Sequence, residues 1–146
     1  MRESKKRVIA GHHAIRELIQ QRPRSIRGAW FVSQWESNAD LREIHKLLAP
    51  TKLKIEVKPS GLLEKECHSH QGVLLFADTL PEYDLAQLKD LSHGVVLLLD
   101  RLEDPHNLGA VLRTSWLLGV KAILIPQERA VGLTATVHKI DCGGAE

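Results

Sequence analysis

The sequence has few cysteines, no long apolar run and no glycine-rich nucleotide-binding fingerprint. Its two cysteines, Cys67 and Cys142, are far apart and fit no disulfide framework, which favours free thiols in a reducing compartment. No apolar run approaches the ~20 residues that a membrane helix needs, and Met1 to Ala10 lacks the apolar stretch of a secretory signal. These absences predict a cytoplasmic protein with no membrane partner. The missing glycine fingerprint argues against an unrelated nucleotide-binding α/β enzyme.

The formal charge of +2 conceals an uneven distribution. Residues 1–58 carry thirteen Lys and Arg against six Asp and Glu, a balance of +7, whereas the remaining 88 residues carry seven against twelve, a balance of −5. The first part therefore has the bias of a surface that binds a polyanion such as nucleic acid. A solvated basic face without a ligand would have the same composition.

Helix and strand signals alternate along the first half of the chain. Apolar residues at helical spacing predict helices around 14–19 and 41–48, which end near Pro23 and Pro50, and a short third helix at Leu62–Leu63. The alternation predicts an α/β fold with a mostly parallel sheet covered by helices. The expected strands are Gly28 to Val32, Lys54 to Val57 and Gly72 to Ala77.

A change of composition divides the chain. We expect a first domain at residues 1–78, a linker at 79–93 that contains Pro81, and a second unit at 94–146. The second unit begins with Val95 to Leu99, the most apolar run of the chain and a candidate central parallel strand. A sheet of two strands cannot bury both of its faces, so we expect something to complete it. The other predicted elements of this unit are a helix at about 107–118, a strand at 122–125 and a helix at 133–140.

The segment Leu99 to Thr114, LDRLEDPHNLGAVLRT, is the most informative one for chemistry. A strand end followed by a helix N-terminus lies where open α/β folds bind ligands. Gly109 allows another backbone or a ligand to approach closely, and Arg113 lies six residues after Asn107. This arrangement favours a phosphate or oxyanion site, although a capped helix with a surface arginine would have the same spacing.

Longer motifs around this segment resemble the SpoU (TrmH/RlmB-type) branch of the SPOUT RNA methyltransferases. DPHNLGAVLRT followed by LLGVKAILIP resembles the first motif of that family, and QERAVGLTATVHKIDCGGAE resembles its R-x-x-x-L-T-x-x-x-x-K-x-S-x-G-A-x-E segment. This match runs from about Val95 to Glu146. In the first domain, Gly11 to Ile15 (GHHAI) and His70 to Val73 (HQGV) resemble motifs of the family's substrate-binding domain.

The resemblance implies an N-terminal L30e-like α/β/α domain that binds RNA, followed by the opening part of a SPOUT methyltransferase domain with a trefoil knot. It implies transfer of a methyl group from S-adenosyl-L-methionine to a ribose 2′-hydroxyl, with a guanosine of large-subunit (23S) rRNA as the expected target and tRNA as a possible one. Family members are homodimers. The positions that match the catalytic motif are Asn107 and Arg113. Arginine stays protonated, so we expect Arg113 to hold a phosphate and favour the alkoxide rather than act as a base.

The sequence also departs from the family pattern. The G-x-E-G-x-G segment and the later I-P-M…S-L-N-V-S-V-A segment, which supply most of the cofactor pocket, do not occur in these residues. Asp141 stands where the family usually has a small residue, and Glu146 matches a motif glutamate, the one candidate cofactor contact. We therefore expect this stretch alone to be inactive in methyl transfer. The alternative is a non-catalytic RNA-binding module.

Other residues are candidates for RNA contact. Arg22, Arg24 and Arg27 cluster beside a turn and are the first choice for phosphate contacts. His12 and His13 either cap the first helix, which we favour, or touch RNA, and the resemblance adds His13 to the RNA contacts. Between the tryptophans, Trp35 in a polar loop is the better candidate for base stacking than Trp30, which lies in an apolar strand. The run Cys67 to His70 (CHSH) lacks a partner pair, so no metal site is expected.

Overall fold

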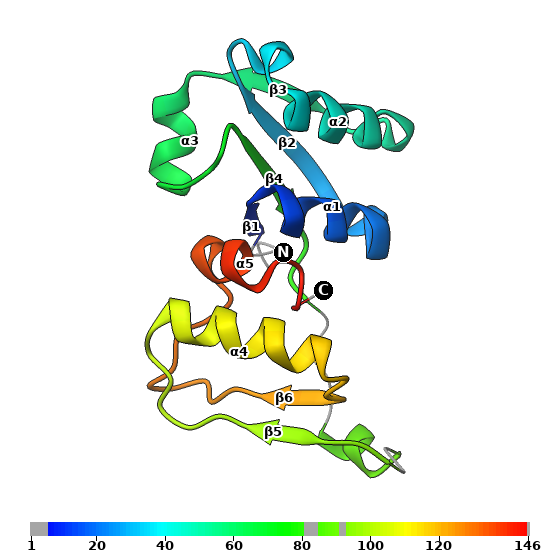
Figure 1. The fold of residues 1–146 in the computed structure, drawn as a ribbon, viewed down its shortest axis with the longest axis vertical. Helices are drawn as coiled ribbons and strands as arrows, with labels where there is room; N and C mark the ends of the chain where they lie inside the picture. Colours follow the sequence, from blue (N-terminus) through cyan, green and yellow to red (C-terminus); the bar gives the residue numbers. More distant parts are fainter. Residues whose placement is uncertain (1–5, 81–84, 91–92, 146) are drawn as a thin grey trace, which may run out of the picture.

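A computed structural model describes residues 6–80, 85–90 and 93–145. Its first unit is a four-stranded sheet with two helices on one face and a third helix on the other (Figure 1). The predicted helices and strands of this unit are all present, and an additional strand precedes them. The elements are β1 (Arg7–Ala10), α1 (His12–Gln21), β2 (Ile26–Val32), α2 (Ala39–Leu48), β3 (Ile55–Lys58), α3 (Ser60–Glu66) and β4 (Val73–Ala77), with 3₁₀ turns at Pro23–Ser25, Trp35–Ser37 and Ala49–Thr51.

The strands of this sheet run in the order β1-β4-β2-β3. β4 lies antiparallel to both β1 and β2, whereas β2 and β3 are parallel. The prediction of a mostly parallel sheet is therefore wrong for this unit. After α3 the chain turns back, and β4 enters between β1 and β2 in the opposite direction. This arrangement was not foreseen because β1 was not predicted.

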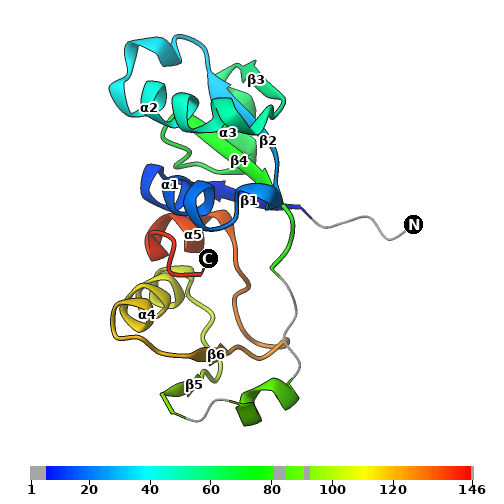
Figure 2. The same ribbon diagram turned by 90° about the vertical axis from the view of Figure 1, so that its right-hand side faces the viewer.

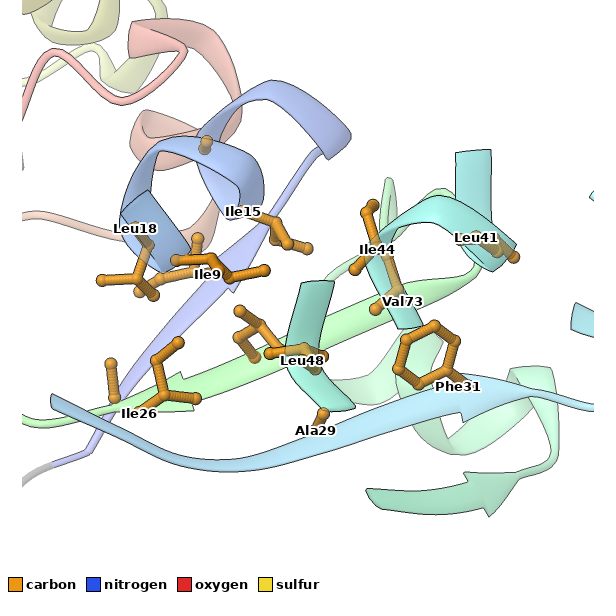
Figure 3. Close-up of a cluster of buried hydrophobic side chains, with 14 residues drawn as sticks. Ile9, Ile15, Leu18, Ile26, Ala29, Phe31, Leu41, Ile44, Leu48 and Val73 are labelled. Atoms are coloured by element: carbon orange, nitrogen blue, oxygen red, sulfur yellow. The ribbon is translucent and has the colours of Figure 1, made fainter. Parts of the chain in front are cut away.

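The main core lies between the sheet and helices α1 and α2 (Figure 3). Each helix contributes an apolar stripe at helical spacing, and alternate residues of the strands face it. Local capping supports the second helix, because the Asn38 side chain accepts hydrogen bonds from the backbone N–H groups of Asp40 (2.9 Å) and Leu41 (3.2 Å). The buried residues of this core include Ile9, Ile15, Leu18, Phe31, Leu41, Ile44, Leu48, Val73 and Leu75.

The second unit contains two parallel strands and two helices, as predicted. β5 (Val96–Leu98) pairs with β6 (Ala122–Leu124), and α4 (Pro105–Leu117) and α5 (Ala135–Asp141) follow them in the chain order β5-α4-β6-α5. The expectation that the first of these strands is a buried central one is wrong, since Leu98 is 75% exposed. Among the described residues β5 is hydrogen-bonded to β6 alone, and Val96 on the same face as Leu98 is also exposed, at 40%. A 3₁₀ helix at Leu85–Asp90 lies in the predicted linker.

Helix α5 joins the two units. It lies between β1 and α1 of the first unit and α4 of the second (Figure 1 and Figure 2). Val137 is fully buried against Leu108 and Leu112 of α4, and Ala135 packs on the cluster around Ala10 and Leu74. The same helix therefore belongs to the cores of both units. Within the described ranges, no helix is long and apolar enough to cross a membrane.

Candidate functional site

Helix α4 carries both residues of the predicted catalytic motif. It begins at Pro105, because Asp104 occupies the N-cap and its Oδ1 accepts a hydrogen bond from the backbone N–H of His106 at 2.9 Å. The helix thus starts slightly before the predicted position. Asn107 lies in its first turn and Arg113 near its middle, and both are exposed.

The structure does not bring these two side chains to the same face. Six residues at about 100° each place Arg113 roughly 120° around the helix from Asn107. Arg113 lines a cleft between α4 and α1, whereas Asn107 does not. In the described part of the chain, Arg113 therefore borders the cleft and Asn107 lies outside it.

The cleft between α1 and α4 has a volume of about 370 Å³. It brings His13, a predicted RNA contact in the first unit, together with Arg113 in the second. The other lining residues were not among the predicted site residues. For those on α1 the sequence held a signal, the polar face on which positions 13, 16, 17 and 20 recur at helical spacing. The lining residues are His13, Arg16, Glu17, Gln20, Arg113, Trp116, Leu117, Asp141 and Cys142.

The charged groups of the cleft differ in how far they are already paired. One terminal nitrogen of Arg16, Nη2, lies 2.7 Å from Asp40 Oδ1 and 2.6 Å from Glu43 Oε2, both on α2. These hydrogen bonds hold the pKa of Arg16 above its ordinary value, and Arg16 holds the pKa of Asp40 below its own. Arg16 is thus neutralised by its neighbours. His13 and Arg113 are exposed, so an anionic ligand can reach both side chains.

Asp141, which lines the cleft, belongs to a buried polar cluster on α5. Asp141 and His138 are fully buried, with His138 Nδ1 3.6 Å from Asp141 Oδ2 and Nε2 3.4 Å from Nη1 of Arg7 on β1. Asp141 Oδ1 also accepts a hydrogen bond of 2.8 Å from the backbone N–H of Gly143. The departure from the family pattern at Asp141 therefore has a local explanation. Its carboxylate organises the turn after α5 and lies beside His138, whose other ring nitrogen lies near Arg7.

Two glycines allow α5 and the turn after it to pack tightly on α4. A Cβ atom on Gly109 would lie 2.6 Å from Ile140 Cβ, and one on Gly144 would lie 2.9 Å from the carbonyl oxygen of Leu112. Neither side chain would fit without separating the two segments. The expected close approach at Gly109 is therefore confirmed as a contact between helices, and it sets the position of Asp141 and Cys142 beside the cleft.

The two histidines at the start of α1 have different environments, and neither caps the helix. The N-cap position is Gly11, which has no side chain, so the favoured capping interpretation is wrong. His12 instead joins α1 to the entry of β4, because its backbone N–H donates to Gln71 Oε1 at 3.2 Å and its Nε2 lies 3.0 Å from the Gln71 carbonyl oxygen. His13 points to the cleft.

The predicted arginine cluster lies around the 3₁₀ turn at Pro23–Ser25, outside the cleft. Arg24 and Arg27 are exposed, and Arg22 is half-buried. Arg27 makes a two-pronged ion pair with Asp78, with Nε 2.8 Å from Oδ1 and Nη2 bonded to Oδ2. This pair holds the pKa of Arg27 above and that of Asp78 below its ordinary value.

The remaining candidates meet three different outcomes. Glu146 lies outside the described residues. The preference for Trp35 as a stacking residue is wrong, because its ring stacks on His45 at 4.2 Å and meets Phe31 edge-on at 5.4 Å. Within the described residues, no three or more His, Cys, Asp or Glu side chains gather in an arrangement that could hold a metal ion.

A second cleft, of about 440 Å³, lies between α4, β6 and the linker. Its lining is apolar apart from Ser115 and Lys121, and Trp116 separates it from the first cleft. A zwitterionic sulfonium cofactor needs several converging polar groups. Among the described side chains of this cleft only Ser115 and Lys121 are clearly polar, so these side chains do not fit such a cofactor by themselves.

Comparisons with known proteins cover both units. Residues 8–83 match the family described as RNA 2'-O ribose methyltransferase substrate binding, and residues 94–146 match the SpoU rRNA Methylase family. The 23S rRNA (guanosine-2'-O-)-methyltransferase RlmB of Neisseria meningitidis serogroup B is 35% identical over 145 residues, which cover 96% of this chain and 58% of that protein. The protein of the same name from Nitrosomonas europaea is 36% identical over 145 residues, which cover 94% of this chain and 55% of that protein. The chain thus spans less than two thirds of the length of these relatives.

Solved structures resemble the whole chain. The crystal structure of the SpoU methyltransferase AviRb from Streptomyces viridochromogenes in complex with AdoMet matches with a TM-score of 0.70 and 17% identity, over 95% of this chain and 50% of that one. A structure described as an RNA 2'-O ribose methyltransferase matches with a TM-score of 0.64 and 24% identity, over 97% of this chain and 52% of that one. The predicted α/β fold class is confirmed.

Proposed function

The chain belongs to the SpoU family of RNA 2'-O-ribose methyltransferases, and from this membership we propose that it binds ribosomal RNA for methylation of a ribose 2′-hydroxyl. The relatives named above act on a guanosine of 23S rRNA, which is the substrate proposed for this chain. In this proposal S-adenosyl-L-methionine supplies the methyl group. Residues 8–83 hold the RNA, and residues 94–146 contribute the first part of the catalytic domain.

The observation that carries the proposal is the shared cleft. His13 comes from the segment that matches the substrate-binding family, and Arg113 comes from the segment that matches the methylase family. Two exposed nitrogen-bearing side chains on facing helices suit an RNA backbone, because phosphate oxygens accept hydrogen bonds from such groups. The positive balance of residues 1–58 supports the same ligand.

Arg113 has a defined role in this proposal. In methyl transfer the ribose O–CH3 bond would form as the sulfonium S–CH3 bond breaks and the thioether leaves, while the hydroxyl proton passes to water. A fixed positive charge nearby favours the alkoxide that develops. Because a guanidinium stays protonated, Arg113 cannot remove the proton itself. It orients the neighbouring phosphate and stabilises the negative charge. Asn107, on another side of α4, is proposed to act on a different part of the assembled site.

The proposal includes an assembly and a location. The division into an RNA-binding domain at 1–78, a linker at 79–93 and a methyltransferase unit from 94 follows the sequence expectation. We propose a homodimer that works in the cytoplasm, with rRNA as its partner and tRNA as a secondary candidate. Sedimentation of the protein that carries these residues tests the dimer, and a monomer at micromolar concentration contradicts it.

Methyl transfer tests the function. The protein that carries these residues is incubated with isotope-labelled S-adenosyl-L-methionine and unmodified 23S rRNA, and the labelled nucleotide is mapped. Arg113→Ala is expected to lower kcat by about 10²- to 10³-fold, the usual effect of removing a donor that stabilises developing negative charge. Arg113→Lys keeps the charge and should recover part of the rate.

Arg42→Ala serves as the matched control, since Arg42 is exposed on α2 and its guanidinium bonds to the Glu36 carbonyl oxygen away from the cleft. It should leave kcat unchanged. Absence of label in rRNA with the wild-type protein contradicts the proposed activity. RNA binding without any methyl transfer favours the non-catalytic module.

A further inference from the structure

The four-stranded sheet has a second face that helices cover only in part. Helices α1 and α2 lie on one face, and α3 lies on the other (Figure 1). Alternate strand residues therefore point away from the main core, and α3 covers only some of them, with Leu63 and Cys67 packed against Ala10 and Leu74. Two half-buried aromatic rings lie beside this cluster, Trp30 on β2, which packs against it, and Phe76 on β4.

These two rings form a continuous aromatic surface, which we call the sheet platform. The ring centroids of Trp30 and Phe76 lie 4.7 Å apart with an angle of 67° between the rings. Both side chains are half-buried rather than enclosed. Gly28 pairs with Phe76 across the strands, and a Cβ atom there would reach Phe76 Cδ2 at 3.9 Å. Because glycine stands at this position, β2 places no side chain directly opposite Phe76.

Cationic side chains surround the platform. Lys58 Nζ lies 5.7 Å from the centroid of the Trp30 ring, which is within cation–π range. Lys54 lies on the same side, where both lysines flank Glu56 at 3.1 Å and 2.6 Å. Arg27, 53% exposed, precedes the open position at Gly28. The three cations outnumber the two carboxylates that pair with them, Glu56 and Asp78.

From this combination we infer that the sheet platform is a second RNA contact, on which a single-stranded base stacks while the neighbouring cations hold its phosphates. Half-exposed aromatic rings on a sheet beside lysine and arginine match the chemistry of an unpaired nucleotide, which has a π face and a negative charge. An apolar protein surface would match the rings but would bring no negative charge to the excess of cations beside them. The inference rests on the proposed function and adds residues to its RNA site.

The platform is separate from the cleft. Helix α1, which lines the cleft, packs on the opposite face of the same sheet, so that one RNA strand reaches both places only by running around the domain. We therefore assign the platform to nucleotides that flank the reacting one. The assignment favours Trp30 over Trp35, since the Trp35 ring is already stacked on His45, whereas the half-buried Trp30 ring meets Phe76 only edge-on.

Binding of a single-stranded 12-nucleotide RNA, measured by fluorescence anisotropy, tests the inference. Trp30→Leu and Phe76→Leu keep apolar side chains but remove the stacking surface, and each should weaken binding about tenfold, within the range known for loss of one stacked base. Trp35→Phe is the matched control on the other face and should bind as the wild type does. Binding of Trp30→Leu within twofold of the wild type overturns the inference.

A second readout does not require a substitution at the platform. In the double variant W35F/W116F, Trp30 is the remaining tryptophan, and stacking of a base should quench its fluorescence on RNA addition. Unchanged fluorescence at saturating RNA overturns the inference. Failure of the platform inference can be distinguished from failure of the proposed function. If R113A weakens RNA binding and W30L does not, only the platform inference is contradicted. A wild-type chain that binds no RNA contradicts the proposed function as well.

Discussion

Substitution of Gly109 by alanine should separate α4 from α5 and destabilise the chain. The new Cβ would lie 2.6 Å from Ile140 Cβ, 2.7 Å from Ile140 Cγ2 and 3.2 Å from the carbonyl oxygen of Val137. Ordinary carbon contacts are about 3.5–4.0 Å, so the helices must move apart by roughly 1 Å. The Cβ of Ile140 belongs to the helix framework and cannot rotate away.

Two opposing effects decide how much Gly109→Ala changes the free energy of unfolding. Alanine is more favourable than glycine in a helix interior by about 1 kcal/mol, whereas overpacking of a close contact costs about 1–3 kcal/mol. The movement also loosens Val137, which is fully buried against α4. We expect a net loss of about 1–2 kcal/mol, which lowers the melting temperature by roughly 2–8 °C in a chain of this size.

The assay is urea unfolding followed by circular dichroism, with Gly61→Ala as the matched control. Gly61 lies within α3, and a Cβ atom there would meet nothing within 4 Å. The control should therefore be neutral or stabilised by up to about 1 kcal/mol. If G109A is as stable as G61A, the tight α4–α5 contact is wrong, and with it the explanation for the position of Asp141 beside the cleft.

Other substitutions test separate parts of the structure. Asn38→Ala removes the cap of α2 and should cost about 1 kcal/mol in urea unfolding, and an unchanged midpoint contradicts the cap. Val137→Ala deletes buried methyl groups between α4 and α5 and should cost about 2 kcal/mol, whereas a loss below 0.5 kcal/mol would argue against a packed interface. The bond from Arg16 lowers the pKa of Asp40, so the stability from this pair is present above about pH 4 and is lost as the pH falls through the lowered pKa. Asp40→Asn should therefore flatten the fall in urea midpoint between pH 5 and pH 3, and equal falls in both proteins would refute the contribution of this pair.

Much of the secondary structure could be predicted because apolar residues follow helical or strand spacing closely. In the predicted stripe of the second helix, Leu41, Ile44 and Leu48 point at the core as expected, whereas Leu47 is exposed. The helices and strands of the second unit appear in the predicted order. β1 was missed because it is short and begins with Arg7 after a basic stretch. Because β1 was not predicted, there was no reason to place β4 antiparallel between two strands. The alternation of helices and strands along the chain favoured parallel strands instead.

The site could be predicted only in part. Motifs identified His13 and Arg113, but no local pattern indicates that residues a hundred positions apart share a cleft, because that depends on how α5 packs on both units. Trp35 was misread for a similar reason. It lies in a polar segment, yet a 3₁₀ turn brings its ring onto His45 of α2. The half-buried position of Trp30 beside Phe76 likewise depends on Gly28 and on the partial cover by α3.

The most direct test of the shared cleft is RNA binding by this chain across a range of salt concentrations. A 23S rRNA fragment is titrated into the wild type, H13A, R113A and the control R42A. If the two matched segments form one RNA site, R113A should weaken binding about tenfold and reduce the salt slope by about 1, as expected for a lost phosphate contact, and H13A should also weaken it. Wild-type affinity and an unchanged slope for R113A would contradict the shared site.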